Sequence, residues 1–366
     1  MKEVIAVRAG IATVVLMLMG GSVIHGIGSQ AGSDAWLAII FAALFSLPFI
    51  LIYARLGDFD PEQDIFHTLE KALGKPLTVV VAIIYGYYAL LLMYYSLDSL
   101  GSFVTVAGLV ETPKVVPRLA LTLIGLMAAK AGIEVLTRWC SLFLRIIVLT
   151  SFLALVLVLK EVDFSNLQPV LFDGIGPVLQ ATLTTMKFPF LETVLFTFAG
   201  AGFRIKNGSR YVLVRGHFAA AALILFIITL TVAVVGPEIY RIQYYPVYGA
   251  VSRIDVGGFF TRLEITVTFI FLITAFVKVS VCQIVAAKCF SYLVGETDYR
   301  RLVTPLALSG IVGSFYLAEG TLEMEKRNLS LWPPLELAVQ VILPVIIWII
   351  AEIRLNKQND TGQKAN

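Results

Sequence analysis

The chain has 366 residues, of which 58% are hydrophobic and only 14% are charged, and its mean hydropathy is +0.87. A soluble domain carries about 25% charged residues, so this composition excludes a soluble globular protein and indicates an integral membrane protein. The net charge of +3 is small and the basic residues are scattered, which argues against a nucleic-acid-binding protein.

The first apolar segment is expected to remain in the protein as a membrane span. Residues 9–33 contain no Asp, Glu, Lys or Arg, and this run is longer than the apolar region of about 7–15 residues in a signal peptide. A helix needs about 20 mostly apolar residues to cross the bilayer. By that criterion the chain is an all-α integral membrane protein with ten transmembrane helices. They are expected at 8–30, 35–54, 76–104, 117–134, 139–159, 176–203, 213–236, 262–290, 302–318 and 334–353.

The distribution of Lys and Arg predicts the orientation of these spans. With the N-terminus inside, 18 of the 28 Lys and Arg residues are assigned to the cytoplasmic side, 8 to the outside, and Lys187 and Lys278 lie within spans. Cytoplasmic loops carry the excess of positive charge, so both termini are expected in the cytoplasm.

Two loops are expected to have structure of their own. In residues 60–76, Asp60 and Pro61 have the positions of a helix cap and first turn, and Ile65 and Leu69 begin a helical apolar pattern. This pattern predicts a short amphipathic helix on the cytoplasmic membrane face. The tyrosine-rich segment 240–260 has two interpretations, an interfacial aromatic belt or a lid over an outward-facing cavity.

Two spans contain residues that interrupt a helix. The first has a glycine-rich stretch at 19–32, and the sixth has Pro189 within FPFLE. These spans occupy matching positions in two halves of five, the pattern of an inverted-repeat transporter whose broken helices meet at a central site. We expect one transmembrane domain over 1–366, with repeats at about 8–159 and 176–318, ninth and tenth spans reaching 353, and a cytoplasmic tail at 354–366. Glycines that only allow close helix packing are the alternative for the first span.

Three short motifs support a family resemblance. SDAWLAII (33–40), GIEVLTR (132–138) and FPFLE (188–192) occur in order in the second, fourth and sixth spans. Together with ten spans, they resemble the permease-like B-subunit family of bacterial spore germination receptors, within the amino acid–polyamine–organocation transporters. His25 departs from that family, in which an aliphatic residue is expected. The resemblance implies a leucine-transporter-like 5+5 inverted repeat with discontinuous first and sixth helices, in the inner spore membrane, and A and C subunits as partners.

The two breaks define the candidate site. Half-helix ends can bind both charges of an amino acid, so the expected ligand is a small nutrient of that kind. The residues expected to bind it are Gly20, Gly21, Ser22, Lys187, Phe188, Pro189 and Glu192, and those expected to couple or gate are His25 and Lys278. Lys187 could contact the ligand, pair with Glu192 or extend to the membrane surface. Lys278 lies in the eighth span, where some relatives of the resembled family bind sodium, and its ammonium could replace that ion.

Other ionisable residues have simpler interpretations. Glu134 and Arg138 are spaced for an i, i+4 salt bridge, Asp98 is expected to face water or an outer vestibule, and His67 and His217 are expected at the interface. No metal-binding spacing and no cofactor motif is present in the sequence.

The sequence leaves three candidate functions. The first is a germinant receptor subunit that binds a nutrient and signals germination, and the alternative is a proton-coupled or uncoupled amino-acid permease. A membrane enzyme is the weakest candidate, because the sequence has no nucleophile, metal or phosphate-binding motif. Receptor and permease share a fold, and the fold does not decide between them.

Overall fold

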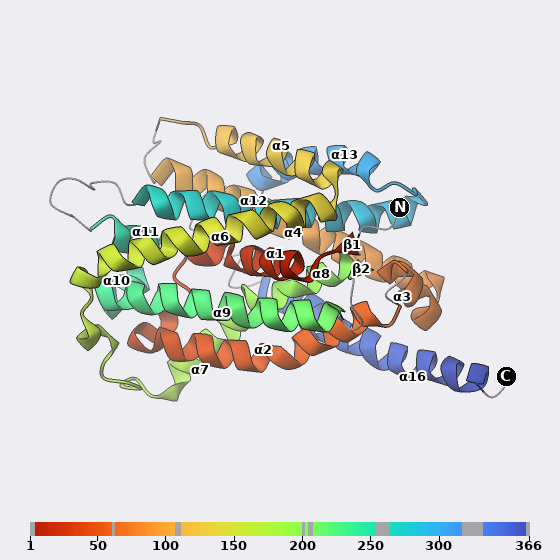
Figure 1. The fold of residues 1–366 in the computed structure, drawn as a ribbon, viewed down its shortest axis with the longest axis horizontal. Helices are drawn as coiled ribbons and strands as arrows, with labels where there is room; N and C mark the ends of the chain where they lie inside the picture. The colour runs from red at the N-terminus through yellow and green to blue at the C-terminus, as the bar shows by residue number, and fades with distance from the viewer. Residues whose placement is uncertain are drawn as a thin grey trace.

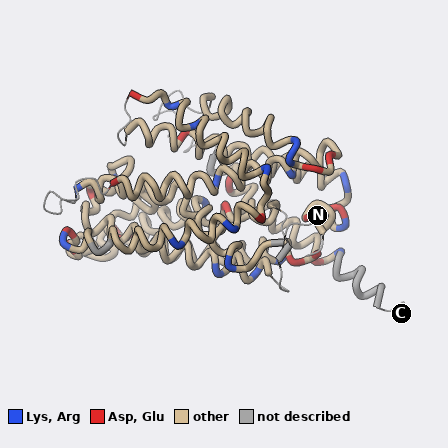
Figure 2. The backbone as a smooth tube through the Cα atoms, turned by 45° about the horizontal axis from the view of Figure 1, so that its top comes forward, with Lys and Arg blue, Asp and Glu red and all other residues tan. Residues whose placement is uncertain are grey.

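The computed structural model describes residues 4–60, 63–106, 111–199, 202–203, 208–253, 264–316 and 332–363. These residues form long helices that run side by side (Figure 1). Charged residues gather mostly toward the two ends of the helices, with few between (Figure 2). This distribution is the one required of a protein whose middle lies in hydrocarbon.

In the first half of the chain the helices are α1 (Val7–Met19), η1 (Gly21–Val23), η2 (Ser29–Asp34), α2 (Ala35–Asp58), α3 (Ile65–Leu73), α4 (Lys75–Val106), α5 (Val115–Ala131) and α6 (Ile133–Val158). Two short 3-10 helices, η3 (Leu159–Glu161) and η4 (Phe164–Leu167), lead to the second half.

In the second half the helices are α7 (Ile175–Lys187), η5 (Phe190–Thr193), α8 (Val194–Phe198), α9 (Gly208–Val235), α10 (Pro237–Ile242), α11 (Pro246–Val251), α12 (Glu264–Val294) and α13 (Arg300–Tyr316). The last span contains α15 (Trp332–Leu337), the π-helix η6 (Ala338–Ile342) and α16 (Leu343–Gln363). One exception to the all-α prediction is a parallel pair of two-residue strands, β1 (Val4–Ile5) and β2 (Gly202–Phe203).

Each of the ten predicted spans coincides with a helix or a chain of shorter helices. Six described helical segments are long and apolar enough to cross a membrane: 29–58, 75–106, 133–154, 208–235, 264–294 and 334–354. The other four predicted spans are shorter or interrupted, so the count of ten stays a prediction. The discontinuous first and sixth helices are confirmed, because α1 and α7 each end in the middle of a predicted span.

The packing relates the two halves of the chain. α2 packs against α9, α4 against α12, and α5 against α13. These pairs join the second, third and fourth predicted spans to their counterparts in the second half, as a 5+5 arrangement requires. α1 packs against α6, α9 and α12 near the middle of the bundle (Figure 1). The repeat boundaries at 8–159 and 176–318 remain predictions.

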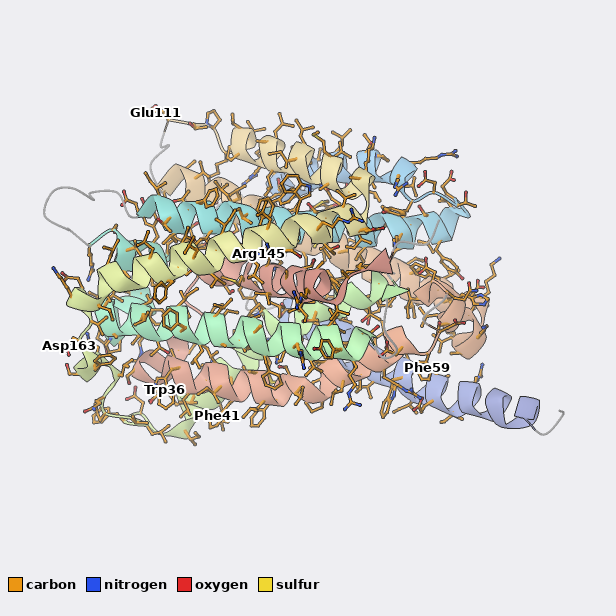
Figure 3. All side chains as sticks on the ribbon, in the orientation of Figure 1. Trp36, Phe41, Phe59, Glu111, Arg145 and Asp163 are labelled. Carbon is orange, nitrogen blue, oxygen red and sulfur yellow. The ribbon has the colours of Figure 1, made fainter. Side chains whose placement is uncertain are left out.

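The positions of the two ends of the chain are consistent with an even number of membrane crossings. β1 and the end of α16 lie toward one end of the bundle (Figure 1). Glu111 and Asp163, from two loops predicted to lie outside, are toward the opposite end from Phe59, which follows α2 on the predicted cytoplasmic side (Figure 3). Arg145 is one of the 18 Lys and Arg residues predicted on the cytoplasmic side, but it lies in the middle of α6.

The prediction for the loop at 60–76 was right about the helix and wrong about its cap and its surroundings. α3 begins after Asp64 rather than Asp60, and Pro61 lies outside the described residues. The predicted apolar face is buried, but it packs against α4 and α16 rather than against lipid. Phe66 also stacks on Tyr292 of α12, with ring centroids 4.8 Å apart.

Two polar residues expected near water are buried. His217 is fully buried between α2 and α9, and its Nε2 lies 2.9 Å from the carbonyl oxygen of Ala43. Asp98 is 4% exposed and forms an ion pair with Arg118, which also donates to the Ser314 carbonyl. The pair lets α4 and α5 bury two charges together. In contrast, the predicted Glu134–Arg138 salt bridge is confirmed, at 2.7 Å.

Candidate functional site

The break in the first span begins directly after α1. Gly20 leaves the helical conformation, with φ 0° and ψ −116°, and η1 follows it. The last carbonyls of a helix lack partners within it, and the Ser22 hydroxyl donates to two of them, Leu18 at 2.9 Å and Met19 at 2.8 Å. Further on, Gly28 has φ +74°, a left-handed conformation that favours glycine. The glycine-rich sequence therefore does interrupt the helix.

The break in the sixth span lies between α7 and η5. Pro189 has no N–H to continue the helix, and the residue before a proline is driven toward extended conformations. Phe188 is extended accordingly, with φ −129° and ψ 117°. The helical chain resumes at Phe190, so Glu192 lies in the first turn of the second half-helix.

A buried ion pair lies between the two breaks. Lys278 of α12 places its Nζ 2.9 Å from Oε1 and 2.7 Å from Oε2 of Glu192. Glu192 is 1% exposed and Lys278 is 4% exposed. The carboxylate is near the positive N-terminal end of η5–α8, and the lysine stem contacts the C-terminal end of α1 at Gly20. The Glu192 carboxylate thus lies near a helix end of opposite polarity.

α12 makes further contacts with both breaks. The Thr274 hydroxyl lies 3.3 Å from the Gly20 carbonyl oxygen. The Lys278 ammonium lies 4.8 Å from the centroid of the Phe188 ring, within range of a cation–π interaction. A side chain at Gly21 would place its Cβ 3.2 Å from both Phe188 and His25. The described geometry therefore brings Gly20, Gly21 and Phe188 to one place.

The tyrosine-rich segment covers the first break. Tyr240 donates its hydroxyl to the Ile27 carbonyl at 2.6 Å, and buried Tyr245 packs its ring against Phe103. The His25 Nε2 lies 3.0 Å from the Ser99 hydroxyl, and its ring is 5.8 Å from that of Tyr245. Tyrosines of an interfacial belt would face lipid headgroups, so these contacts favour the lid interpretation. The part of the segment at 254–260 lies outside the described residues.

Two of the predicted site residues face elsewhere. Ser22 is turned into the end of α1 and is 1% exposed. Lys187 does not pair with Glu192: its Nζ lies 3.9 Å from Glu336 of α15. The alternative in which Lys187 and Glu192 hold each other is therefore wrong for this structure. Among the described residues, no group of three or more His, Cys, Asp or Glu is placed to hold a metal ion.

Sequence reasoning missed the residues that the last span contributes. Gln340 is fully buried, and its Nε2 lies 2.6 Å from the Tyr88 hydroxyl and 3.1 Å from the Lys187 carbonyl oxygen. Glu336 and Gln340 are polar residues within an apolar run. The rule that polar groups in spans mark functional candidates would have found them had it been applied to that run.

Comparison with protein families gives one match over most of the chain. Residues 5–321 match the family described as spore germination protein. The chain is 26% identical to spore germination protein KB of Bacillus subtilis over 357 residues, covering 96% of this chain and 95% of that protein. It is 21% identical to the putative B. subtilis spore germination protein YfkT, covering 88% of each chain, and 23% identical to spore germination protein XB of Bacillus anthracis, covering 69% and 70%.

Comparison with solved structures gives transporters of one fold. A nucleobase-cation-symport-1 family transporter, MHP1, closed with bromovinylhydantoin bound, has a TM-score of 0.74 at 12% identity, covering 95% of this chain and 78% of its own. MhsT in complex with L-phenylalanine has a TM-score of 0.64 at 14% identity, covering 96% and 89%. At these identities the likeness establishes the fold alone. The chain therefore belongs to the spore germination protein family, as its three sequence motifs predicted, and has the leucine-transporter-like fold.

Proposed function

We propose that this chain is the membrane subunit of a germinant receptor, and that it binds a small nutrient, an amino acid, at the breaks of the first and sixth helices. The observation that carries the proposal is the buried Lys278–Glu192 pair, which lies beside the breaks of the first and sixth helices. Buried charges in a membrane protein are expensive and mark functional sites by default.

The chemistry of the breaks suits a ligand with two opposite charges. Glu192 offers a carboxylate to a ligand ammonium, and Lys278 offers an ammonium to a ligand carboxylate. In the described state the two neutralise each other, and Phe188 lies over the lysine. A zwitterionic ligand would separate the pair and replace both partners, which is a direct route from binding to a conformational change.

The Lys278 ammonium also bears on ion coupling. It supplies a fixed positive charge beside the C-terminal end of α1, where a bound cation would otherwise be stabilised by the helix dipole. We therefore propose that ligand binding needs no sodium. The alternative is a proton-coupled or uncoupled amino-acid permease, which the transporter fold supports. An uptake measurement distinguishes it from a receptor.

Family membership supports a proposed location, orientation and set of partners. The receptor would be located in the inner spore membrane with both termini in the cytoplasm, and would pass its conformational state to A and C subunits. Lys187 and Ser22 would act at the site only after a rearrangement, since they are engaged with Glu336 and α1. His25 already lies beside Gly21, with its Nε2 near the Ser99 hydroxyl.

Substitution at the two breaks tests the proposed site. Gly21→Leu would fill the space between His25 and Phe188, where even a Cβ would come within 3.2 Å of both. Pro189→Ala would remove the helix breaker. Each change is expected to abolish germination triggered by a nutrient mixture while the protein remains in the spore membrane at normal amount.

A matched glycine provides the control. Gly176 is at the start of α7, and a Cβ there meets nothing within 4 Å, so Gly176→Ala should germinate normally. Normal germination by both Gly21→Leu and Pro189→Ala would show that the breaks are not the site.

A further inference from the structure

The break in the sixth span is held from the side by the last span. The carbonyl of Lys187, at the C-terminal end of α7, accepts a hydrogen bond from the Gln340 Nε2 at 3.1 Å. The Lys187 side chain reaches the same span, with its Nζ 3.9 Å from Glu336. Terminal carbonyls of a helix need a partner when they are buried, and this one takes it from a residue 153 positions away.

Gln340 is presented by an irregular turn of its own helix. Residues Ala338–Ile342 form a π-helix between α15 and α16. The extra residue of such a turn frees carbonyl groups, and π-bulges occur frequently at functional sites. Here tyrosines supply the missing donors: the Tyr85 hydroxyl donates to the Val339 carbonyl at 2.9 Å, and the Tyr53 hydroxyl donates to the Gln340 carbonyl.

The amide nitrogen of Gln340 is hydrogen-bonded, whereas its amide oxygen is not. Its Nε2 also lies 2.6 Å from the Tyr88 hydroxyl. Its Oε1 is buried and accepts no hydrogen bond within the described part of the chain. A side chain that served packing alone would be apolar here, because an unpaired buried acceptor is unfavourable. The glutamine is therefore best explained by the bond to the α7 terminus.

We infer that Gln340 is a positioning residue of the ligand site: it fixes the end of α7, and through it the extended Phe188 and the turn that carries Glu192. This inference deepens the proposed function and rests on it for the role of the break. It also assigns the π-helix of the last span a part in ligand recognition, although none of its residues touches Glu192 or Lys278 in the interactions described above.

The test distinguishes a substitution that shifts the break from one that only lowers the stability of the protein. Gln340→Leu removes both hydrogen bonds, and Gln340→Glu keeps the size of the side chain but replaces the donor by an acceptor that faces the Lys187 carbonyl. Two tyrosine variants are matched controls. Tyr94→Phe removes a tyrosine hydroxyl of α4 that lies 3.3 Å from the Ser309 hydroxyl of α13, away from α7 and the π-helix, and Tyr88→Phe leaves the bond between Gln340 and Lys187 in place.

Two readouts are measured for each variant. The first is the rate at which a maleimide modifies Met186→Cys, a substitution beside the break; the three native cysteines are buried and give little background. The second is binding of a panel of radiolabelled L-amino acids to the purified full chain in lipid nanodiscs. Both Gln340 variants should raise the rate several-fold and weaken binding about tenfold, the factor that corresponds to loss of the one bond to the Lys187 carbonyl. Both tyrosine variants should match the unmodified chain.

The outcomes distinguish the inference from the proposed function. Gln340 variants that behave as Tyr94→Phe in both readouts would overturn the positioning role. If the unmodified chain binds no amino acid, the proposed function fails, and the modification rate still decides whether Gln340 holds the break. If Gln340→Leu does not accumulate in the membrane, Gln340→Glu and Gln340→Asn provide the same comparison.

Discussion

At the scale of single residues, Glu192 and Lys278 dominate the electrostatics of the bundle interior. They lie 86 positions apart in sequence, and both are at most 4% exposed. Removing one partner of a buried pair leaves an uncompensated charge, whereas replacing both partners by apolar residues is often close to neutral. This asymmetry makes the pair testable without knowledge of the ligand.

We predict that Glu192→Leu or Lys278→Met alone lowers the free energy of unfolding by about 3–5 kcal/mol. The double variant should be more stable than either single variant. Unfolding of the purified protein by SDS in mixed micelles would measure all three changes. If the two single effects simply add in the double variant, the charges do not depend on each other, and the pair described here does not form.

The sequence identifies these charged residues but not their partners. Lys187, Glu192 and Lys278 interrupt apolar runs and are therefore visible by composition alone. Lys187 is five residues from Glu192 on the chain, which made their pairing a reasonable expectation. Pro189 intervenes and ends α7, so the two side chains diverge toward Glu336 and Lys278 respectively. Which of two distant helices supplies a partner depends on tertiary packing, which no local pattern records.

At the scale of elements, the breaks were predictable and the contacts of the helices were less so. Proline and clustered glycines have local conformational effects, so the interruptions of the first and sixth spans follow from sequence. The sequence predicted Asp60 as the cap of α3, whereas the helix begins after Asp64. The two aspartates could not be told apart because both precede the apolar pattern. The π-helix at Ala338–Ile342 was not predicted, since the hydroxyls that stabilise it come from α2 and α4.

Close approach of α1 and α9 depends on one glycine. A Cβ on Gly216 would lie 2.7 Å from the side chain of Val14, closer than atoms in contact allow. We predict that Gly216→Val destabilises the protein by about 1–3 kcal/mol through overpacking. The second change Val14→Gly would remove both Val14 atoms that this Cβ meets, its Cβ and its Cγ1, and should restore part of that loss.

The same unfolding measurement in mixed micelles checks this prediction. Gly176→Ala provides the control, because nothing lies within 4 Å of its Cβ. Unchanged stability of Gly216→Val would mean that α1 and α9 are farther apart than in this structure.

At the scale of the whole molecule, the chain combines a transporter fold with membership of a germination family. Its relatives by sequence are germination proteins, whereas its structural neighbours are transporters at 12% and 14% identity. Fold does not fix function. A receptor needs only a ligand that favours one conformation, and a permease must also release the ligand on the other side.

The most direct test is to measure binding and counterflow of radiolabelled L-amino acids with the purified chain in liposomes. We predict saturable binding of at least one amino acid, unchanged when sodium is replaced by choline and lost in Gly21→Leu, with no accumulation by counterflow. Accumulation of label that Gly21→Leu abolishes would identify a permease and contradict the receptor role. Absence of binding to any amino acid, or binding that Gly21→Leu leaves intact, would contradict the assignment of the ligand site to the two helix breaks.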